Sequence, residues 1–314
     1  MVATTSYQAG VETSLVQMAY VQEAAWGVTP TAKLQQIRFT GESLRGQKTR
    51  QRPDEINPSR VQSAPVTTEE SASGGINFAL SYGTYDDLLA GLLCNDWATN
   101  VLTNGLLFKS FLIEKRFSAT QLLQYSGAMV GSGTLDIRRG AFVSGSLNVM
   151  AKEEKKAITS ASTGGTYTAA TTGRVVDPVG GIRDVQIDAS AIQAVCNSIS
   201  LNITNDGAAA DYGLGSAAAQ GMRMGTFGVS GSVEFYFRDF TLYDRFKAET
   251  AGVFSWRTLD AAGNAYKWEL PVATMMNPTV NAGGPNQAVM ARYDLEGSAD
   301  TNGVALRITR TPIT

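Results

Sequence analysis

Apolar and polar residues alternate with a period of two over much of the chain, which is the pattern of strands buried on one face. In the clearest segment Ile76, Phe78 and Leu80 are separated by small polar residues or alanine. The same alternation recurs near residues 143–149, 198–203, 229–237, 266–270, 289–295 and 304–308. The sequence therefore predicts a mainly β protein, an antiparallel β-sandwich or partial barrel.

Two short segments with helical spacing interrupt these strands. Thr84 stands three residues before Asp87, and Thr241 stands three residues before Asp244. A threonine at the N-cap accepts hydrogen bonds from the first backbone N–H groups, and an acidic residue three positions on complements the cap. We therefore expect two short flanking α-helices, capped by Thr84 and Thr241.

These segments expose an internal repeat. The stretch from Gly74 to Leu89 aligns without gaps with the stretch from Gly231 to Phe246, an offset of 157 residues. Glycine, the apolar strand positions, threonine and aspartate all coincide. Each half of the chain is thus predicted to contain a strand that starts at glycine and runs into a helix, so the fold is predicted to be internally duplicated.

Two long stretches lack periodicity and suggest the domain boundaries. Residues 46–73 hold too little apolar content to pack, and a structureless loop of this length is commonly functional or disordered. Residues 152–173 are charged and then rich in Ser, Thr, Ala and Gly, as in a linker. The predicted organisation is an N-terminal arm at 1–35, a first β half at 36–150 with a long loop at 46–73, a linker or hairpin extension at 151–190 and a second β half at 191–314.

The composition argues against an enzyme. The sequence contains no histidine, which removes the usual general base and the commonest metal ligand. Neither a phosphate-binding glycine loop nor a nucleophile elbow is present, and adjacent carboxylates such as Asp86 and Asp87 do not converge on one atom. We predict no catalytic residue, no cofactor and no metal site. Cys94 and Cys196 lack any metal-binding spacing and are expected to be reduced packing residues.

The charge balance limits contact with nucleic acid. The net charge is -2 and the charged fraction is 17%, whereas binding to phosphate requires a basic excess. Apolar runs stay shorter than the roughly 18 residues that span a bilayer, and the first basic residue is Lys33. Neither a signal peptide nor a membrane anchor is expected, so the protein is predicted to stay in the cytoplasm where it is made.

The polar faces of the predicted strands form a first candidate surface. Their outward positions are almost all Ser or Asn, where solvent faces usually carry more Lys and Glu. Small polar residues can reflect β propensity alone, or they can form a wet, smooth surface that does not grip a polyanion. The candidate positions are Ser144, Ser146, Asn148, Ser198, Ser200, Asn202, Ser230, Ser232 and Glu234.

The long loop is a second candidate surface, for contacts between subunits. Its acidic and basic residues can form ion pairs within the loop or across an interface. These residues are Lys48, Arg50, Arg52, Asp54, Glu55 and Arg60.

Several segments, taken in their order along the chain, carry a family resemblance. They are Val21–Pro30 (VQEAAWGVTP), Ile37–Leu44 (IRFTGESL), Gly75–Leu89 (GINFALSYGTYDDLL), Phe111–Lys115 (FLIEK), the strand pair at 127–152, and the stretch from Asn202 to Asp244. In this order they resemble the tail tube proteins, or major tail proteins, of siphophages, the long non-contractile-tailed bacteriophages.

The resemblance implies a structural virion protein. Six subunits would form a ring, their sheets would join into an inner β-barrel, and rings would stack around a tape-measure protein into a tube for DNA ejection into the host. The tail terminator and tail tip proteins are the other implied partners. The long loop and N-terminal arm would reach a neighbouring subunit, and the Ser and Asn faces would line the channel. The implied location is the virion tail, assembled in the host cytoplasm.

Two other interpretations stay open at this point: a type VI secretion-like tube protein and a surface carbohydrate-binding β-sandwich. Sugar binding would favour an exposed cluster of aromatic residues. The four tryptophans are instead scattered through apolar segments, at Trp26, Trp97, Trp256 and Trp268.

Overall fold

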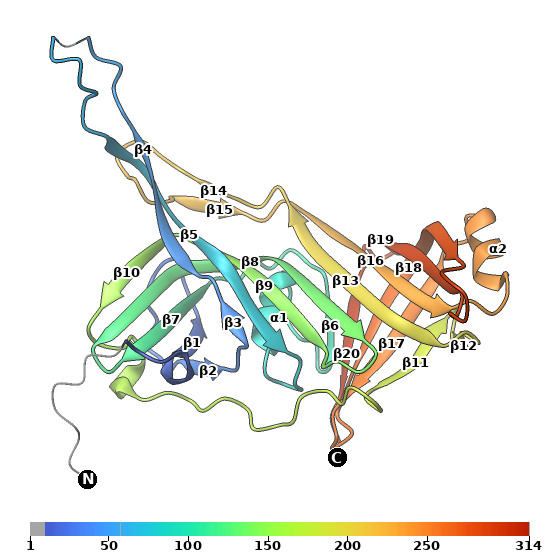
Figure 1. Cartoon of the computed structure of the whole chain (residues 1–314). Coiled ribbons are helices and arrows are strands. Elements are labelled where there is room, and N and C mark those ends of the chain that lie inside the picture. Colours follow the sequence, from blue (N-terminus) through green and yellow to red (C-terminus); the bar gives the residue numbers. More distant parts are fainter. Residues whose placement is uncertain (1–9, 57, 314) are drawn as a thin grey trace.

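The computed structural model describes residues 10–56 and 58–313, and it consists mainly of antiparallel strands (Figure 1). The strands fall into an N-terminal and a C-terminal unit. The N-terminal unit contains β1 (Gln17–Gln22), β2 (Gln35–Ile37), β3 (Gly41–Glu42), β4 (Arg45–Gln51), β5 (Val66–Ala79), α1 (Asp86–Leu92), β6 (Val101–Thr103), β7 (Phe111–Ser118), β8 (Gln121–Arg138), β9 (Ser144–Ala151) and β10 (Glu153–Ala157).

The C-terminal unit follows after an extended connection. It contains β11 (Ile182–Ile187), β12 (Ser190–Ala191), β13 (Cys196–Asp206), β14 (Ala209–Asp211), β15 (Gly221–Arg223), β16 (Thr226–Tyr236), α2 (Thr241–Lys247), β17 (Gly252–Leu259), β18 (Ala265–Asn281), β19 (Met290–Ser298) and β20 (Arg307–Thr311). Residues 17–22 and 153–157, predicted as arm and linker, thus belong to strands of the N-terminal unit.

The two units repeat one pattern of strand pairing, which confirms the predicted duplication. In the N-terminal unit β1 pairs with β7, β7 with β8, β8 with β9 and β10, and β5 with β9 and β4. In the C-terminal unit β11 pairs with β17, β17 with β18, β18 with β19 and β20, and β16 with β19 and β13.

One long sheet joins the units. Its order is β4–β5–β9–β8–β13–β16–β19–β18, and the pairing of β8 with β13 connects one unit to the other. Strands β8 and β18 are bent, so their first halves leave the long sheet and pair with β7 and β17 in two shorter sheets. Gly127 lies at the bend of β8 with a φ of 62°, a backbone conformation that favours glycine.

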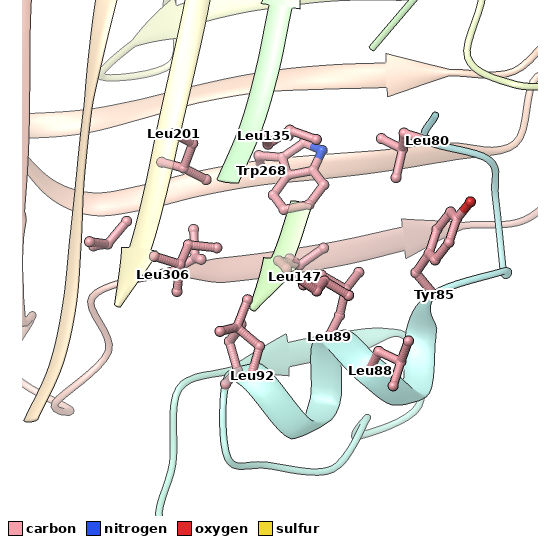
Figure 2. Close-up of a cluster of buried hydrophobic side chains, with 14 of the residues drawn as sticks. Leu80, Tyr85, Leu88, Leu89, Leu92, Leu135, Leu147, Leu201, Trp268 and Leu306 are labelled. Carbon is pink, nitrogen blue, oxygen red and sulfur yellow. The ribbon is translucent and has the colours of Figure 1, made fainter. Parts of the chain in front are cut away.

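A continuous hydrophobic core runs through both units. Helix α1 packs between strands of the N-terminal unit and Trp268 and Leu306 of the C-terminal unit (Figure 2). Burial of each leucine contributes about 2 kcal/mol. Polar contacts support this packing, because Arg310 of β20 forms an ion pair with Asp86 at 2.6 Å. The predicted β-sandwich with short flanking helices is confirmed.

The predicted helix caps are wrong. Helix α1 begins at Asp86, two residues after Thr84, and Thr84 is buried with its hydroxyl bonded to Ser81 at 2.6 Å. Helix α2 begins at Thr241 itself, and the N–H of Thr241 donates to the Asp239 carboxylate at 3.0 Å. The Thr84 hydroxyl bonds to Ser81 and Thr241 is itself the first helical residue, so the cap pattern alone did not locate the helix ends.

The long loop also differs from the prediction. Residues 45–51 and 66–79 are β4 and β5, and their ladder extends away from the body of the molecule (Figure 1). Every residue of β4 is exposed. Because β4 is exposed throughout and only Ala72 is buried in the part of β5 that pairs with it, apolar residues do not alternate along this ribbon, although backbone pairing continues. The two strands and the tip at 52–65 are called the arm below.

The aligned glycines of the repeat have a shared steric role. A Cβ at Gly74 would lie 2.4 Å from the carbonyl oxygen of Ser43, and one at Gly231 would lie 2.2 Å from that of Ser200. The neighbouring strand thus approaches too closely for any side chain in both units.

Replacement of Gly231 by alanine is expected to cost about 3 kcal/mol of unfolding free energy, because the clash is with backbone that cannot move locally. Chemical denaturation of the purified chain measures this loss. The control is Gly173→Ala, where a Cβ meets nothing within 4 Å, and its expected change is within about 0.5 kcal/mol. Equal stability of the two variants would contradict the steric role.

Candidate functional site

The predicted polar positions gather on one face of the long sheet. Strand register aligns Ser144 of β9 with Asp136 of β8, Asp136 with Ser200 of β13, and Ser200 with Ser232 of β16. The next row is Ser146, Thr134, Asn202 and Ser230. A third row begins with Asn148 beside Ser132, and a fourth holds Arg138, Ser198 and Glu234. We call these rows the polar face.

All nine positions predicted from the sequence therefore share this face, although they come from three separate segments. None of them is buried. Their neighbours along each strand point the other way: Ile199, Leu201 and Val233 are each 1% exposed in the core. The alternation in sequence thus separates a wet face from a packed one.

Two strands of the polar face were not predicted from the sequence to be part of it. Strand β8 supplies Ser132, Thr134 and Asp136 between buried residues, and this period-two pattern was available in the sequence. Strand β19 adds Arg292, Asp294 and Glu296, opposite Glu234, Ser232 and Ser230 respectively. The β19 side chains on this face are longer and charged, unlike the Ser and Asn positions from which the face was predicted, so β19 was not included in the prediction.

Hydrogen bonds between neighbouring strands order the small side chains. Ser200 Oγ donates to Asp136 Oδ1 at 2.8 Å, and Asn148 Nδ2 donates to Ser132 Oγ at 3.0 Å. With β19 included, the four rows carry the carboxylates Asp136, Glu234, Asp294 and Glu296 against the guanidinium groups of Arg138 and Arg292. The excess of negative charge and the absence of lysine from these rows make the surface unfavourable for phosphate.

The six loop residues lie on the arm rather than on the polar face. Lys48 forms an ion pair with Glu70 across the ladder at 2.5 Å, and Arg52 donates to the carbonyl oxygen of Ser63 at 3.1 Å. At the tip Ile56 is fully exposed. The remaining charged positions, Arg50, Asp54, Glu55 and Arg60, are exposed as well.

A second projection crosses the base of the arm. The connection between β13 and β16 forms the small hairpin of β14 and β15, and the N–H of Glu70 donates to the carbonyl oxygen of Ala217 at 2.7 Å. The hairpin occupies, in the C-terminal unit, the place that the arm has in the N-terminal unit. No sequence signal pointed to this contact.

Neither cysteine is paired with the other. Cys94 is buried and Cys196 is partly buried. Burial raises the pKa of the Cys94 thiol to about 11 and that of Cys196 to about 12, so both are mostly protonated at neutral pH and poorly nucleophilic. Within residues 10–56 and 58–313 there is no group of three or more acidic, cysteine or histidine side chains placed to hold a metal ion.

The described part of the chain has no helix long and apolar enough to cross a membrane. A search of curated proteins finds no match. Among protein-family models, the one described as phage tail tube protein matches residues 13–299. That match spans both units, the polar face and the arm, and the chain belongs to the phage tail tube protein family.

Proposed function

We propose that this structural tail tube protein assembles into stacked rings whose polar faces line a channel for DNA. The observation that carries the proposal is the polar face itself, which crosses the junction between the two units without interruption. A tube wall needs one wet face and one packed face, and the long sheet has both.

The physical requirement on the lumen is low affinity for DNA. Each phosphate held by Lys or Arg adds affinity and slows passage. Ser, Thr and Asn side chains that bond to each other, with more carboxylates than guanidinium groups, supply few such contacts. We propose a role without catalysis, in keeping with a sequence that lacks histidine.

The open edges of the long sheet favour self-association. Strand β4 at one end and the second half of β18 at the other each have one paired neighbour, and unpaired edges are templates for another chain. We further propose that the rings enclose a tape-measure protein, that terminator and tip proteins close the tube, and that it is built in the host cytoplasm.

Negative-stain microscopy of the purified chain tests this proposal. Rings or open-ended tubes are the expected result at high protein concentration. The proposal fails if the chain is strictly monomeric there and also monomeric in its native particle.

A further inference from the structure

The junction between the two units shows how one tube unit joins the next. Seven residues of β13, from Ser198 to Thr204, pair antiparallel with β8 from Arg138 to Ser132. At the centre of this junction Leu201 lies opposite Leu135, and both are buried. The polar face continues across the junction because Ser200 lies opposite Asp136.

Both partners of this junction have counterparts at the free ends of the long sheet. Phe78 corresponds to Phe235 in the repeat, and these pair with Gly145 and Ala291, which pair in turn with Leu135 and Val280. Val280 of β18 therefore stands where Leu135 stands in β8. On the other side, Ile76 and Val233 pair with Glu42 and Ile199, so β3 and β4 stand where β13 stands.

Apolar side chains near the free edge of β18 are more exposed than their counterparts in the N-terminal unit. Val280 is 37% exposed, whereas its counterpart Leu135 is 4% exposed. Helix α2 shows the same contrast, because it buries only Leu242, while α1 buries five residues beneath the adjoining unit. Phe240, just before α2, is 59% exposed. Each difference lies where the N-terminal unit is covered by a neighbour and the C-terminal unit is not.

At the other free edge of the long sheet, polar side chains form hydrogen bonds with the backbone of Leu44. The carbonyl oxygen of Leu44 accepts from Lys115 Nζ at 3.1 Å and from Tyr125 Oη at 3.0 Å, and the N–H of Leu44 donates to Glu42 at 3.0 Å. Backbone groups that lack a strand partner are thus satisfied by polar side chains, a common protection of open edges.

The C-terminal unit has apolar residues at the corresponding positions. Strand register matches Glu42, Lys115 and Tyr125 with Ile199, Trp256 and Leu270, and all three are buried in the core. There β8 supplies the backbone partner for β13, so no polar side chain is needed. The polar set in the N-terminal unit therefore marks an edge whose strand partner is missing from the single chain.

We propose that the second half of β18 in one copy of this chain pairs antiparallel with β3 and β4 of the next copy, which repeats the internal junction. By correspondence, Val280 faces Leu44 and Asn281 faces Ser43. Since each chain carries two tube units, a ring of six units closes with three chains. This inference rests on the proposed assembly into rings.

Disulfide trapping tests the register. The pair Ser43→Cys and Asn281→Cys is placed in a chain that also carries Cys94→Ala and Cys196→Ala. Ser43 bonds through its backbone to Gly75 of β5, so the pair is of the non-hydrogen-bonded type, whose close Cα atoms suit a disulfide. Oxidation of assembled tubes is expected to give covalent dimers and closed trimers as the largest species.

Two further cysteine pairs serve as the positive and the negative control. The counterpart pair Asp136→Cys and Ser200→Cys is expected to form a disulfide within one chain and to leave the electrophoretic band a monomer. The pair Ser43→Cys and Thr274→Cys, displaced along β18, is expected to give no cross-link. If normal tubes form and the 43–281 pair stays reduced, the junction is wrong while the proposed function stands; covalent species of up to six chains overturn the three-chain ring.

If the cysteine variant fails to assemble, a second variant tests the proposed pairing of β18 with the next copy. Val280→Glu places a charge on the exposed edge and is expected to abolish tubes while leaving the thermal midpoint of the subunit unchanged. Val179→Glu is the matched control, because Val179 is 89% exposed and belongs to no strand of the long sheet. Tubes of normal abundance from the Val280 variant overturn the proposal, and a parent chain that never forms tubes refutes the proposed function itself.

Discussion

Removal of the tip of the arm is expected to leave a folded, soluble subunit that no longer elongates into tubes. The tip projects beyond the body of the molecule, and Ile56 on it is fully exposed (Figure 1). It carries basic and acidic residues side by side, and Pro53, Pro58 and Pro65 restrict its backbone. The exposed charged side chains of such a segment can contact a partner, and docking onto that partner would order the segment.

The structure indicates where to cut. Gln51 and Val66 pair across the ladder, so residues 52–65 can be replaced by Asn-Gly, which forms a two-residue hairpin turn. This keeps the ion pair between Lys48 and Glu70 and the contact of Glu70 with Ala217. A wider deletion, of residues 48–70, would remove both of these and would confuse folding with assembly.

Two measurements separate the outcomes. The unfolding free energy of the shortened chain is expected to stay within about 0.5 kcal/mol of the parent, because the described residues that are lost are exposed except for the half-buried Ser63. Tube length in micrographs is expected to fall to single rings or short stacks. A full-length chain with Arg50, Arg52 and Arg60 replaced by glutamine tests the role of charge separately. This variant should elongate weakly if charge pairing orders the tip. Tubes of normal length from the shortened chain would refute this role.

Much of the architecture was predictable because a strand that is buried on one face alternates apolar and polar residues with a period of two. The polar face and the duplication follow from residues such as Ser200 and Gly231, whose neighbours are apolar or sterically constrained. That these positions line a channel remains a prediction. The ladder of β4 and β5 shows no such alternation, since β4 is exposed throughout and only Ala72 is buried in the part of β5 that pairs with it.

Other features depend on contacts between segments that are distant in sequence. The hydroxyl of Thr84 is drawn to Ser81 rather than to the helix start, and Lys115 reaches the backbone of Leu44. A single sequence does not show which edge of a sheet is open, so the polar cluster around Leu44 was not predicted. The repeated pairing of strands made that cluster interpretable.

Lysines placed on the polar face are expected to slow DNA passage without preventing assembly. Ser146, Asn202 and Ser230 lie in one row across β9, β13 and β16, and all are at least partly exposed. Their replacement by lysine therefore disturbs no core packing, and each new ammonium group can contact a phosphate. Tubes should form at normal abundance, because the edges of the long sheet are unchanged.

Binding of duplex DNA to these tubes provides the measurement. For every phosphate contacted, the slope of log K against log salt concentration is expected to steepen by roughly 0.9. Virions built with the triple-lysine chain should eject DNA more slowly than virions with glutamine at the same three positions, which matches side-chain length without charge. If the lysine and glutamine tubes bind DNA equally and eject at the same rate, the polar face does not line the channel, and the tube wall must present another surface to its lumen.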